Sequence, residues 1–351
     1  MSALLNWPDV LTALVMGEDL DTHSTAWAME EILSGNATSA QIAGFAVALR
    51  AKGETLAEVQ GLVDSMYRHA TPLTVEGRVI DIVGTGGDRA KTVNISTMSA
   101  VVIAGAGARV VKHGNRAASS SSGSADVLEE LGVRLDVPPA RIPDILDEVG
   151  ITFCFAPVFH SSLRFAAVPR RELGIATTFN FLGPLTNPAR PEAMAVGVAD
   201  SAMAPIMAGI FAARGADALV FRGDDGLDEI TTTTTTSIWV ADGSKGSVTR
   251  SSLDPTTFGL TYSSAEALRG GDVAFNAKAF GRILDGEKSA VRDAVLLNAA
   301  SGLVAHEGVD GDLDERMTIA IHRAAESIDS GAARHVLDMW AQATERATAE
   351  L

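Results

Sequence analysis

The chain has 351 residues and a formal net charge of −16 at pH 7, and 46% of its residues are apolar. This length allows two domains, or one domain with a large insertion, and the apolar fraction excludes an intrinsically disordered chain. The negative charge argues against nucleic acid as a main partner, because the phosphate backbone attracts basic proteins.

The composition also predicts the compartment. The single cysteine, Cys154, lies between two phenylalanines and is expected in the core, so the chain forms no disulfide and suits the reducing cytoplasm. The first residues lack a basic stretch and include Asp9, which excludes a signal peptide. The longest apolar-looking run, 194–221, contains Asp200 and Arg214, so it predicts a strand, a loop and a buried helix of a soluble protein.

The first 70 residues follow a helical pattern. TSAQ (38–41) and TLAE (55–58) are capping-box sequences that open apolar-periodic runs, and Gly53 stands where a glycine ends a helix. The segment 71–77 has the composition of a linker. These residues therefore predict a separate helical domain.

The pattern then changes to alternating strands and helices. RVIDIV (78–83) predicts a strand, GTGGDRAKTVN (84–94) a loop, 96–104 a helix closed by Gly105, and ARVVK (108–112) a second strand. This strand–helix–strand unit implies a parallel sheet whose ligand sites lie at the carboxyl ends of the strands.

The alternation continues to the end of the chain. Further helices are expected over 125–131, 140–149 and 201–214, further strands over 151–155 and 217–222, and only helices over 290–345. The run of six threonines at 231–236 favours a strand, because threonine is β-branched.

The first motif with functional character is GTGGD (84–88), followed by NIST (94–97) at the start of the next helix. Glycines let the backbone approach a ligand closely, and exposed N–H groups form anion-binding nests, although such a cluster also suits a simple tight turn. Asn94 or Ser96 can act as a helix cap or face a phosphate, and the two roles are compatible.

The second motif, KHGNRAASSSSGS (112–124), places Lys112, His113 and Arg116 before a serine-rich loop and a helix start. Amides, hydroxyls and cationic side chains at a helix N-terminus suit a phosphate or pyrophosphate. A solvated serine-rich loop is the alternative, and His113 by itself is more typical of a structural histidine.

The third motif, GDDGLDE (223–229), carries four carboxylates in a turn after a strand. Carboxylate oxygens favour Mg²⁺, which typically binds one or two of them together with substrate phosphates. A solvated acidic loop remains the alternative.

In the fourth motif, 170–188, Arg170 and Arg171 can bind a carboxylate or phosphate, or the segment is only a connector. The sequence has no P-loop and no serine-nucleophile motif, so the residues indicate a Mg²⁺-dependent enzyme of a phosphorylated or pyrophosphorylated small molecule.

These motifs, together with FNFLGPLTNPA (179–189), occur in the order seen in anthranilate phosphoribosyltransferases, and the chain resembles that family. The resemblance implies a small helical domain (1–72, with a returning stretch near 168–184) hinged to a larger α/β domain (73–351) with a mostly parallel central sheet. It also implies transfer of a phosphoribosyl group from 5-phosphoribosyl 1-pyrophosphate (PRPP) to the amine of anthranilate in tryptophan biosynthesis, and a homodimer formed through the helical part.

The resemblance also assigns roles to residues. The residues implied to bind PRPP are Gly84, Gly87, Asp88, Thr92, Asn94, Ile95, Ser96, Thr97, Lys112, His113, Gly114, Asn115, Arg116, Ala117, Ala118, Ser119, Ser120 and Ser124. Asn115 and Arg170 are implied to contact anthranilate, and Ser96, Asp228 and Glu229 to bind Mg²⁺. No covalent nucleophile is expected. The chain departs from the family pattern at Ser161, Pro169 and Ala176, all on the acceptor side.

Two other functions fit the same fold. A pyrimidine-nucleoside phosphorylase would use free phosphate and a nucleoside in place of PRPP. A non-catalytic, nucleic-acid-binding relative would require a basic groove, against which the net charge of −16 weighs.

Overall fold

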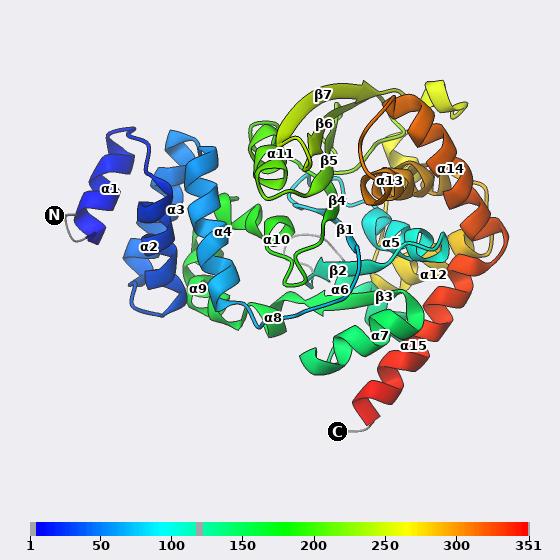
Figure 1. The fold of residues 1–351 in the computed structure, drawn as a ribbon, viewed down its shortest axis with the longest axis horizontal. Coiled ribbons are helices and arrows are strands. Elements are labelled where there is room, and N and C mark those ends of the chain that lie inside the picture. The colour runs from blue at the N-terminus through cyan, green and yellow to red at the C-terminus, as the bar shows by residue number, and fades with distance from the viewer. Residues whose placement is uncertain (1–4, 117–121, 350–351) are drawn as a thin grey trace. The chain divides into compact units, whose positions relative to one another are not determined.

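The structure is a computed structural model that describes residues 5–116 and 122–349. The chain forms two compact units: Met1–Pro72 with Ala156–Pro188, here the helical unit, and Leu73–Phe155 with Ala189–Leu351, here the α/β unit (Figure 1). The second segment of the helical unit is therefore longer than the stretch near 168–184 that the sequence analysis placed there.

The helical unit consists of helices and short turns. Its helices are α1 (Trp7–Val15), α2 (Thr22–Leu33), α3 (Ser39–Lys52), α4 (Leu56–His69), α8 (Ala156–Phe159), α9 (Arg164–Leu173) and α10 (Leu182–Leu185), with 3₁₀ turns at Ser161–Leu163 and Thr178–Asn180. Both capping boxes are confirmed, at the starts of α3 and α4, and Gly53 caps the end of α3 with a φ of 90°. The local signals in the sequence thus define where these helices begin and end.

Close packing of α2 against α4 forms the centre of the helical unit. A Cβ atom on Gly61 would lie 2.1 Å from the hydroxyl oxygen of Thr25, so only glycine allows this approach. Met29 and Leu62 are buried here, and burying such a side chain stabilises the fold by roughly 1.5–3 kcal/mol.

Glu58 is a buried charge that ties three segments of the helical unit together. Its carboxylate accepts hydrogen bonds from the backbone N–H groups of Leu20 (2.9 Å) and Thr55 (2.8 Å) and from Nζ of Lys52 (3.0 Å). Removal of the carboxylate would leave the two backbone N–H groups without this acceptor in a region shielded from water, while Lys52 would keep its bond to Asp19 (2.7 Å).

We expect Glu58→Ala to destabilise the helical unit by about 3 kcal/mol, as is usual when one partner of a buried ion pair is removed. Hydrogen exchange of the α2 and α4 amides measures this change. Glu18→Ala, at an exposed acidic side chain, is the control and should leave the exchange rates unchanged. Equal protection in the two variants would contradict the structural role of Glu58.

The α/β unit alternates strands and helices as the sequence predicted. Its strands are β1 (Ile80–Gly84), β2 (Val110–Gly114), β3 (Ile151–Phe155), β4 (Ala193–Gly197), β5 (Asp217–Gly223), β6 (Thr236–Asp242) and β7 (Ser247–Leu253). Its helices are α5 (Ile95–Gly105), α6 (Ser124–Glu130), α7 (Ile142–Val149), α11 (Met203–Ala213), α12 (Val273–Leu284), α13 (Ala290–Glu307), α14 (Leu313–Asp329) and α15 (Ala332–Ala349). Three 3₁₀ turns lie at Pro139–Arg141, Pro255–Phe258 and Ala265–Leu268.

Within the described residues, the seven strands form one sheet in the order β3-β2-β1-β4-β5-β6-β7. Strands β1 to β5 pair in parallel, and β6 and β7 pair antiparallel, which confirms the mostly parallel sheet. Helices α11 and α13 both pack on β5, on opposite sides of it in Figure 1. The chain runs outward from β1 to β3, then returns to place β4 on the other side of β1. Ligands of such sheets bind at this switch in direction, at the carboxyl ends of the strands.

Some predicted elements differ from the structure in their bounds, and one differs in type. Strand β2 is shifted by two residues, to Val110–Gly114 from the predicted 108–112, and β1 begins at Ile80, two residues after the predicted start. The prediction of a strand over 231–236 was wrong except at Thr236, where β6 begins. The hydroxyls of Thr231 (2.8 Å) and Thr233 donate instead to the carboxylate of Asp225, and these side-chain bonds hold the run in a bend. β-propensity is weak enough for such local partners to override it.

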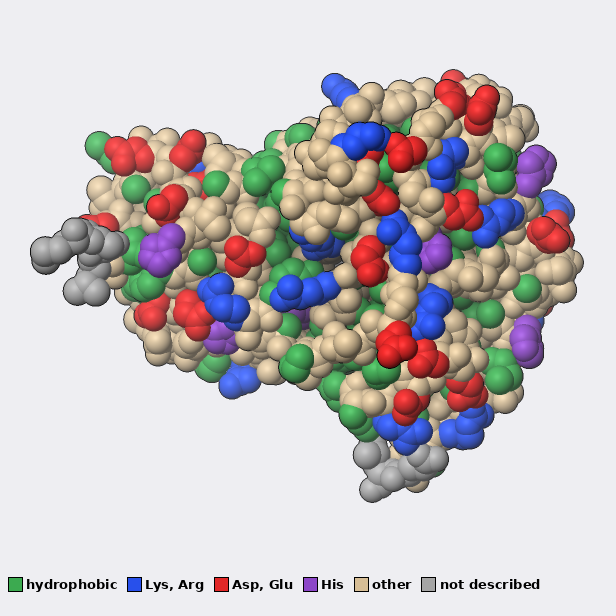
Figure 2. All heavy atoms as spheres, in the orientation of Figure 1, with side chains coloured by type: hydrophobic (Ala, Val, Ile, Leu, Met, Phe, Trp, Pro, Cys, Tyr) green, Lys and Arg blue, Asp and Glu red, His purple; other side chains and the backbone are tan. Residues whose placement is uncertain are grey.

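Other predictions from composition can be compared directly. Cys154 is buried, as expected, and 194–221 covers β4, a loop and α11, as expected, and also the first five residues of β5. Within the described ranges, no helix combines the length and apolar character needed to cross a membrane. Figure 2 shows acidic and basic side chains intermixed on the visible face of the α/β unit, and ion pairs such as Arg109–Asp147 (2.6 Å) lie on its surface.

Candidate functional site

The acidic turn after β5 crosses the carboxyl ends of β1 and β4 at the switch point. A Cβ atom on Gly84 would lie 2.4 Å from Oδ2 of Asp228, and one on Gly197 would lie 1.7 Å from the carbonyl oxygen of Asp228. Both strands therefore end in glycine because any side chain there would displace the turn. This brings GLDE (226–229) beside the glycine loop that follows β1.

Asp228 and Glu229 are both 8% exposed, so a solvated loop is excluded for this pair. Oδ2 of Asp228 accepts a hydrogen bond from the backbone N–H of Gly86 (2.6 Å). Oε1 of Glu229 accepts one from the N–H of Ser96 (3.2 Å), in the first turn of α5. The two carboxylates thus join both parts of the first motif, GTGGD and NIST.

The carboxylates at this site repel one another in a poorly solvated environment. Burial, and then the neighbouring Asp88, raises the pKa of Asp228 to about 8. Burial and the charge of Asp228 raise the pKa of Glu229, while Lys112 acts in the opposite direction. Clustered titratable groups with strongly perturbed pKa values are typical of functional sites, and a cation beside them would relieve the repulsion.

The other two carboxylates of the acidic motif have a different role. Asp224 accepts hydrogen bonds from the hydroxyls of Thr235 (2.5 Å) and Ser237 (3.0 Å), and Asp225 binds the threonine bend. Both aspartates are exposed. The structure therefore separates the motif into an outer pair that shapes the turn and an inner pair that faces the glycine loop.

The glycine loop, 84–94, has an unusual backbone. Gly86 (φ 69°) and Gly87 (φ 92°) are left-handed, and so are the non-glycine residues Arg89 (φ 61°) and Lys91 (φ 55°). Such conformations orient successive N–H groups and occur where the surrounding structure enforces them. Here the enforcement comes from backbone bonds, from Val93 N–H to the Leu268 carbonyl (3.0 Å) and from Gly270 N–H to the Lys91 carbonyl (2.8 Å).

The second motif is divided between the sheet and the surface. Lys112 was expected at the end of its strand, but β2 lies two residues further along the chain than predicted, at Val110–Gly114, and the Lys112 side chain is fully buried. Its Nζ donates to the Ile82 carbonyl (2.5 Å), and burial lowers its pKa against the attraction of Asp81 and Glu229. The His113 N–H donates to Asp81 (3.2 Å). Lys112 therefore acts as a buried counter-charge behind the acidic pair.

The rest of this motif lies around the start of α6. Asn115 and Arg116 are exposed. Arg116 pairs with Asp126 (3.1 Å) and Glu129 (2.9 Å from Nη2 to Oε1), so its charge is compensated by its own chain. Ser124 accepts a hydrogen bond from the hydroxyl of Thr97 (3.0 Å). This bond links the first motif (84–97) to the second motif (112–124), which are here called the two anion loops. The remaining predicted residues, Ala117, Ala118, Ser119 and Ser120, lie outside the described residues.

Arg170 belongs to the helical unit, on α9. Its guanidinium lies 5.5 Å from the ring centre of Phe179 and forms neither a hydrogen bond nor an ion pair with the residues that the structure describes. Burial lowers its pKa. Pro169, the residue before it, lies inside α9 and is buried. Arg170 is thus a partly buried cation suited to a carboxylate ligand, whereas Arg171 is exposed.

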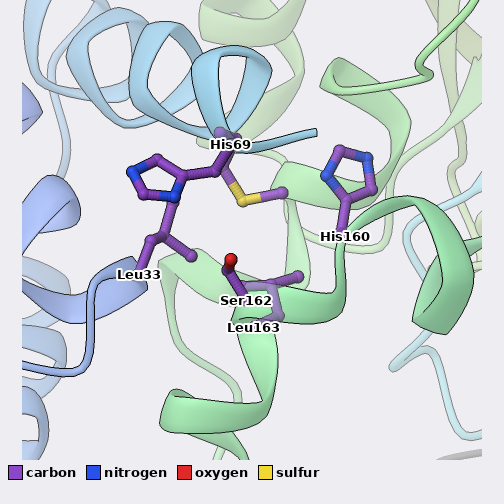
Figure 3. A pocket seen from close by; sticks show the side chains of 6 residues that line it. Leu33, His69, His160, Ser162 and Leu163 are labelled. Atoms are coloured by element: carbon purple, nitrogen blue, oxygen red, sulfur yellow. The ribbon is translucent and has the colours of Figure 1, made fainter. Parts of the chain in front are cut away.

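Figure 3 shows a small pocket in the helical unit, lined in part by His69, His160 and Ser162. The two imidazoles lie on opposite sides of it, but each has a structural partner: His69 Nε2 contacts Glu30 (2.6 Å) and His160 Nε2 contacts the Thr186 carbonyl (2.8 Å). The pocket has essentially no room for a water molecule, so it is not a candidate substrate site.

Sequence reasoning missed two residues that organise the site. Asp81 is a fully buried carboxylate within β1, and its position in the apolar strand RVIDIV was the available signal. Asn298 of α13 binds both backbone groups of Ile230, which follows Glu229, with its Oδ1 accepting at 2.9 Å and its Nδ2 donating at 2.9 Å. No local pattern distinguishes Asn298, because its partner is far away in the sequence.

Comparison with known proteins agrees with this fold. Residues 76–334 match the glycosyl transferase family a/b domain, and residues 8–70 match the glycosyl transferase family helical bundle domain. The two matches, with the switch-point site between β1 and β4, define a two-domain glycosyl transferase.

Individual relatives narrow this class. The chain is 64% identical to an anthranilate phosphoribosyltransferase of a Nocardioides species, over 97% of this chain and 99% of the relative. The anthranilate phosphoribosyltransferase of Thermus thermophilus superposes with a TM-score of 0.87 at 38% identity, over 96% of this chain and 99% of that one. The anthranilate phosphoribosyltransferase of Saccharomyces cerevisiae, in complex with PRPP and Mg, superposes with a TM-score of 0.87 at 26% identity, over 97% of this chain and 98% of that one. The chain belongs to the anthranilate phosphoribosyltransferase family.

Proposed function

We propose that this protein transfers the phosphoribosyl group of PRPP to the amine of anthranilate, giving N-(5-phosphoribosyl)anthranilate and pyrophosphate in tryptophan biosynthesis. The observation that carries the proposal is the meeting of two anion-loop motifs and a buried carboxylate pair at the switch point, in a chain 64% identical to a family member. Glycine-loop N–H groups and the N-terminus of α5 suit phosphate groups.

In the proposed reaction the amine nitrogen forms a bond to the anomeric carbon as the bond to pyrophosphate breaks, with inversion. An aromatic amine is neutral at pH 7, so attack requires no prior deprotonation, and its proton leaves after the bond forms. The protein then contributes mainly positioning and stabilisation of the leaving group, which fits a site without an assigned nucleophile.

We propose Mg²⁺ as the cation of this site. Buried carboxylates with raised pKa values fit a hard divalent ion, and Asp228, Glu229 and the Ser96 hydroxyl would hold it together with substrate oxygens. Bound there, the ion would neutralise charge on the pyrophosphate. Within the described residues, no group of three or more His, Cys, Asp or Glu side chains is arranged to hold a metal. Mg²⁺ needs only one or two carboxylates when the substrate supplies phosphates.

We further propose that Arg170 grips the anthranilate carboxylate and that the chain forms a homodimer through the helical unit. Exposed apolar side chains on that unit, including Val15 (75% exposed), Met16 (73%) and Leu56 (41%), support the dimer. The cytoplasmic location predicted from the single cysteine stays a prediction.

The direct test uses the purified protein with anthranilate, PRPP and Mg²⁺. We expect the fluorescence of anthranilate to disappear only when both PRPP and Mg²⁺ are present. Pyrimidine nucleosides with free phosphate are assayed in parallel. Phosphorolysis of a nucleoside without any consumption of anthranilate would favour the nucleoside phosphorylase instead.

The metal assignment is tested with Asp228→Asn combined with Glu229→Gln, which keep an acceptor for the Gly86 and Ser96 N–H groups. We expect Mg²⁺-dependent binding of PRPP to weaken by more than about tenfold in calorimetry, because both negative charges are lost. The control pair, Asp224→Asn and Asp225→Asn, changes the outer carboxylates of the same turn and should bind as the wild type does. If PRPP binding by the inner-pair variant depended on Mg²⁺ as it does in the wild type, Asp228 and Glu229 would not be ligands of the metal.

The acceptor assignment is tested with Arg170→Ala. A hydrogen bond that involves a charged group contributes roughly 1.5–3 kcal/mol, and about 1.4 kcal/mol corresponds to a tenfold change. The KM for anthranilate should therefore rise by about ten- to a hundredfold, while the KM for PRPP changes little. Arg171→Ala, at the exposed neighbour, is the control. An equal rise for both substrates would indicate a structural role for Arg170.

A further inference from the structure

We propose that Asn276, on α12, is a positioning residue for the PRPP site: it sets the orientation of the Asn94 amide and thereby connects the two anion loops. The inference rests on the proposed function. Asn276 is 2% exposed and belongs to none of the motifs identified in the sequence. Its Nδ2 donates to Oδ1 of Asn94 (2.9 Å), and its Oδ1 accepts from the backbone N–H of Gly271 (2.9 Å).

The direction of every hydrogen bond in this chain of amides is determined by its two ends. At one end, the Gly271 N–H can only donate, so the oxygen of the Asn276 amide must face it. The NH₂ of Asn276 then faces Asn94, whose oxygen must accept. The NH₂ of Asn94 is left to donate to the Ser122 carbonyl (3.1 Å), which can only accept. Reversing either amide would place two donors or two acceptors together.

These bonds join three segments that are distant in the sequence. Asn94 is the N-cap residue of α5, yet its side chain makes no capping bond, because its amide is used between Asn276 and Ser122. Ser122 lies directly before Gly123, the N-cap residue of α6. The bond from Asn94 therefore holds the start of α6 against the start of α5, where the two anion loops meet.

The segment around Asn276 is well placed for this role because it already braces the glycine loop. Thr92 forms a β-bridge with Arg269. A Cβ atom on Gly270 would lie 2.6 Å from the Thr92 carbonyl oxygen and 2.8 Å from Oδ1 of Asn276, so the backbones are as close as glycine permits. Asn276 extends this brace from the first loop to the second through Asn94.

The first test is the affinity for PRPP, measured by calorimetry in the presence of Mg²⁺. Asn276→Ala should weaken PRPP binding by about tenfold, which corresponds to the loss of a buried hydrogen bond that orders the site. The KM for anthranilate should stay within about twofold. Ser327→Ala is the matched control: it removes a buried hydrogen bond from α14 to the Val102 carbonyl of α5 (2.8 Å), away from both loops. It should leave PRPP affinity unchanged.

The second test is a double-mutant cycle with Asn94→Ala. Because Asn276 acts through Asn94, adding Asn276→Ala to Asn94→Ala should cause no further loss of PRPP affinity. Independent, multiplicative losses would overturn the proposal, as would wild-type affinity in Asn276→Ala.

Asn276→Asp covers the case in which the alanine variant does not fold. It keeps the volume and the acceptor for Gly271, and in its ionised form it cannot donate to Asn94. At a pH where this carboxyl is ionised it should therefore also weaken PRPP binding, and this loss should disappear in the Asn94→Ala background. A loss that persists there would overturn the positioning role. If the wild type itself binds no PRPP, the proposed function fails; if the wild type and both Asn276 variants bind equally, only this inference fails.

Discussion

The structure of the α/β unit depends on one constraint: two carboxylates are buried at the switch point between β1 and β4, where the chain begins to add strands on the other side of the sheet. Asp228 and Glu229 lose most of their hydration there, and the charge of Asp88 adds to the cost, which is why the pKa values of both carboxyl groups are raised. A buried charge is tolerated only when hydrogen bonds and opposite charges compensate it. Much of the surrounding sequence supplies that compensation.

Several residues are explained by this constraint. Gly84 and Gly197 leave space for the acidic turn at the ends of two adjacent strands. Asn298 holds the backbone of the turn from α13. Lys112 is buried within the sheet, and its charge partly offsets the rise in the pKa of Glu229. The negative charge of this turn raises the free energy of burying it, and the same charge makes the turn suitable for binding a divalent cation.

The two ligand chemistries of the proposed reaction are built differently. The phosphate-type site uses backbone N–H groups and helix N-termini held by a network of buried bonds, so its precision comes from the fold of the α/β unit. The proposed acceptor contact uses a single guanidinium, Arg170, stacked near Phe179 in the helical unit. The phosphate-type site therefore depends on many residues, whereas the proposed acceptor contact depends on one side chain and its immediate neighbours.

The sequence by itself determined many of the elements and the order of the motifs, although it predicted neither β7 nor α12. Capping boxes, β-branched runs and glycine loops act over a few residues, so β3 and the starts of α3 and α4 could be predicted closely. Only the tertiary structure decided which side chains of each motif face the site. The Lys112 side chain is buried and donates to the Ile82 carbonyl. The acidic motif is divided into an outer and an inner pair of carboxylates. The amide of Asn94 forms hydrogen bonds with Ser122 and Asn276. The physical reason is that these choices depend on partners far along the chain, whose positions no local pattern encodes.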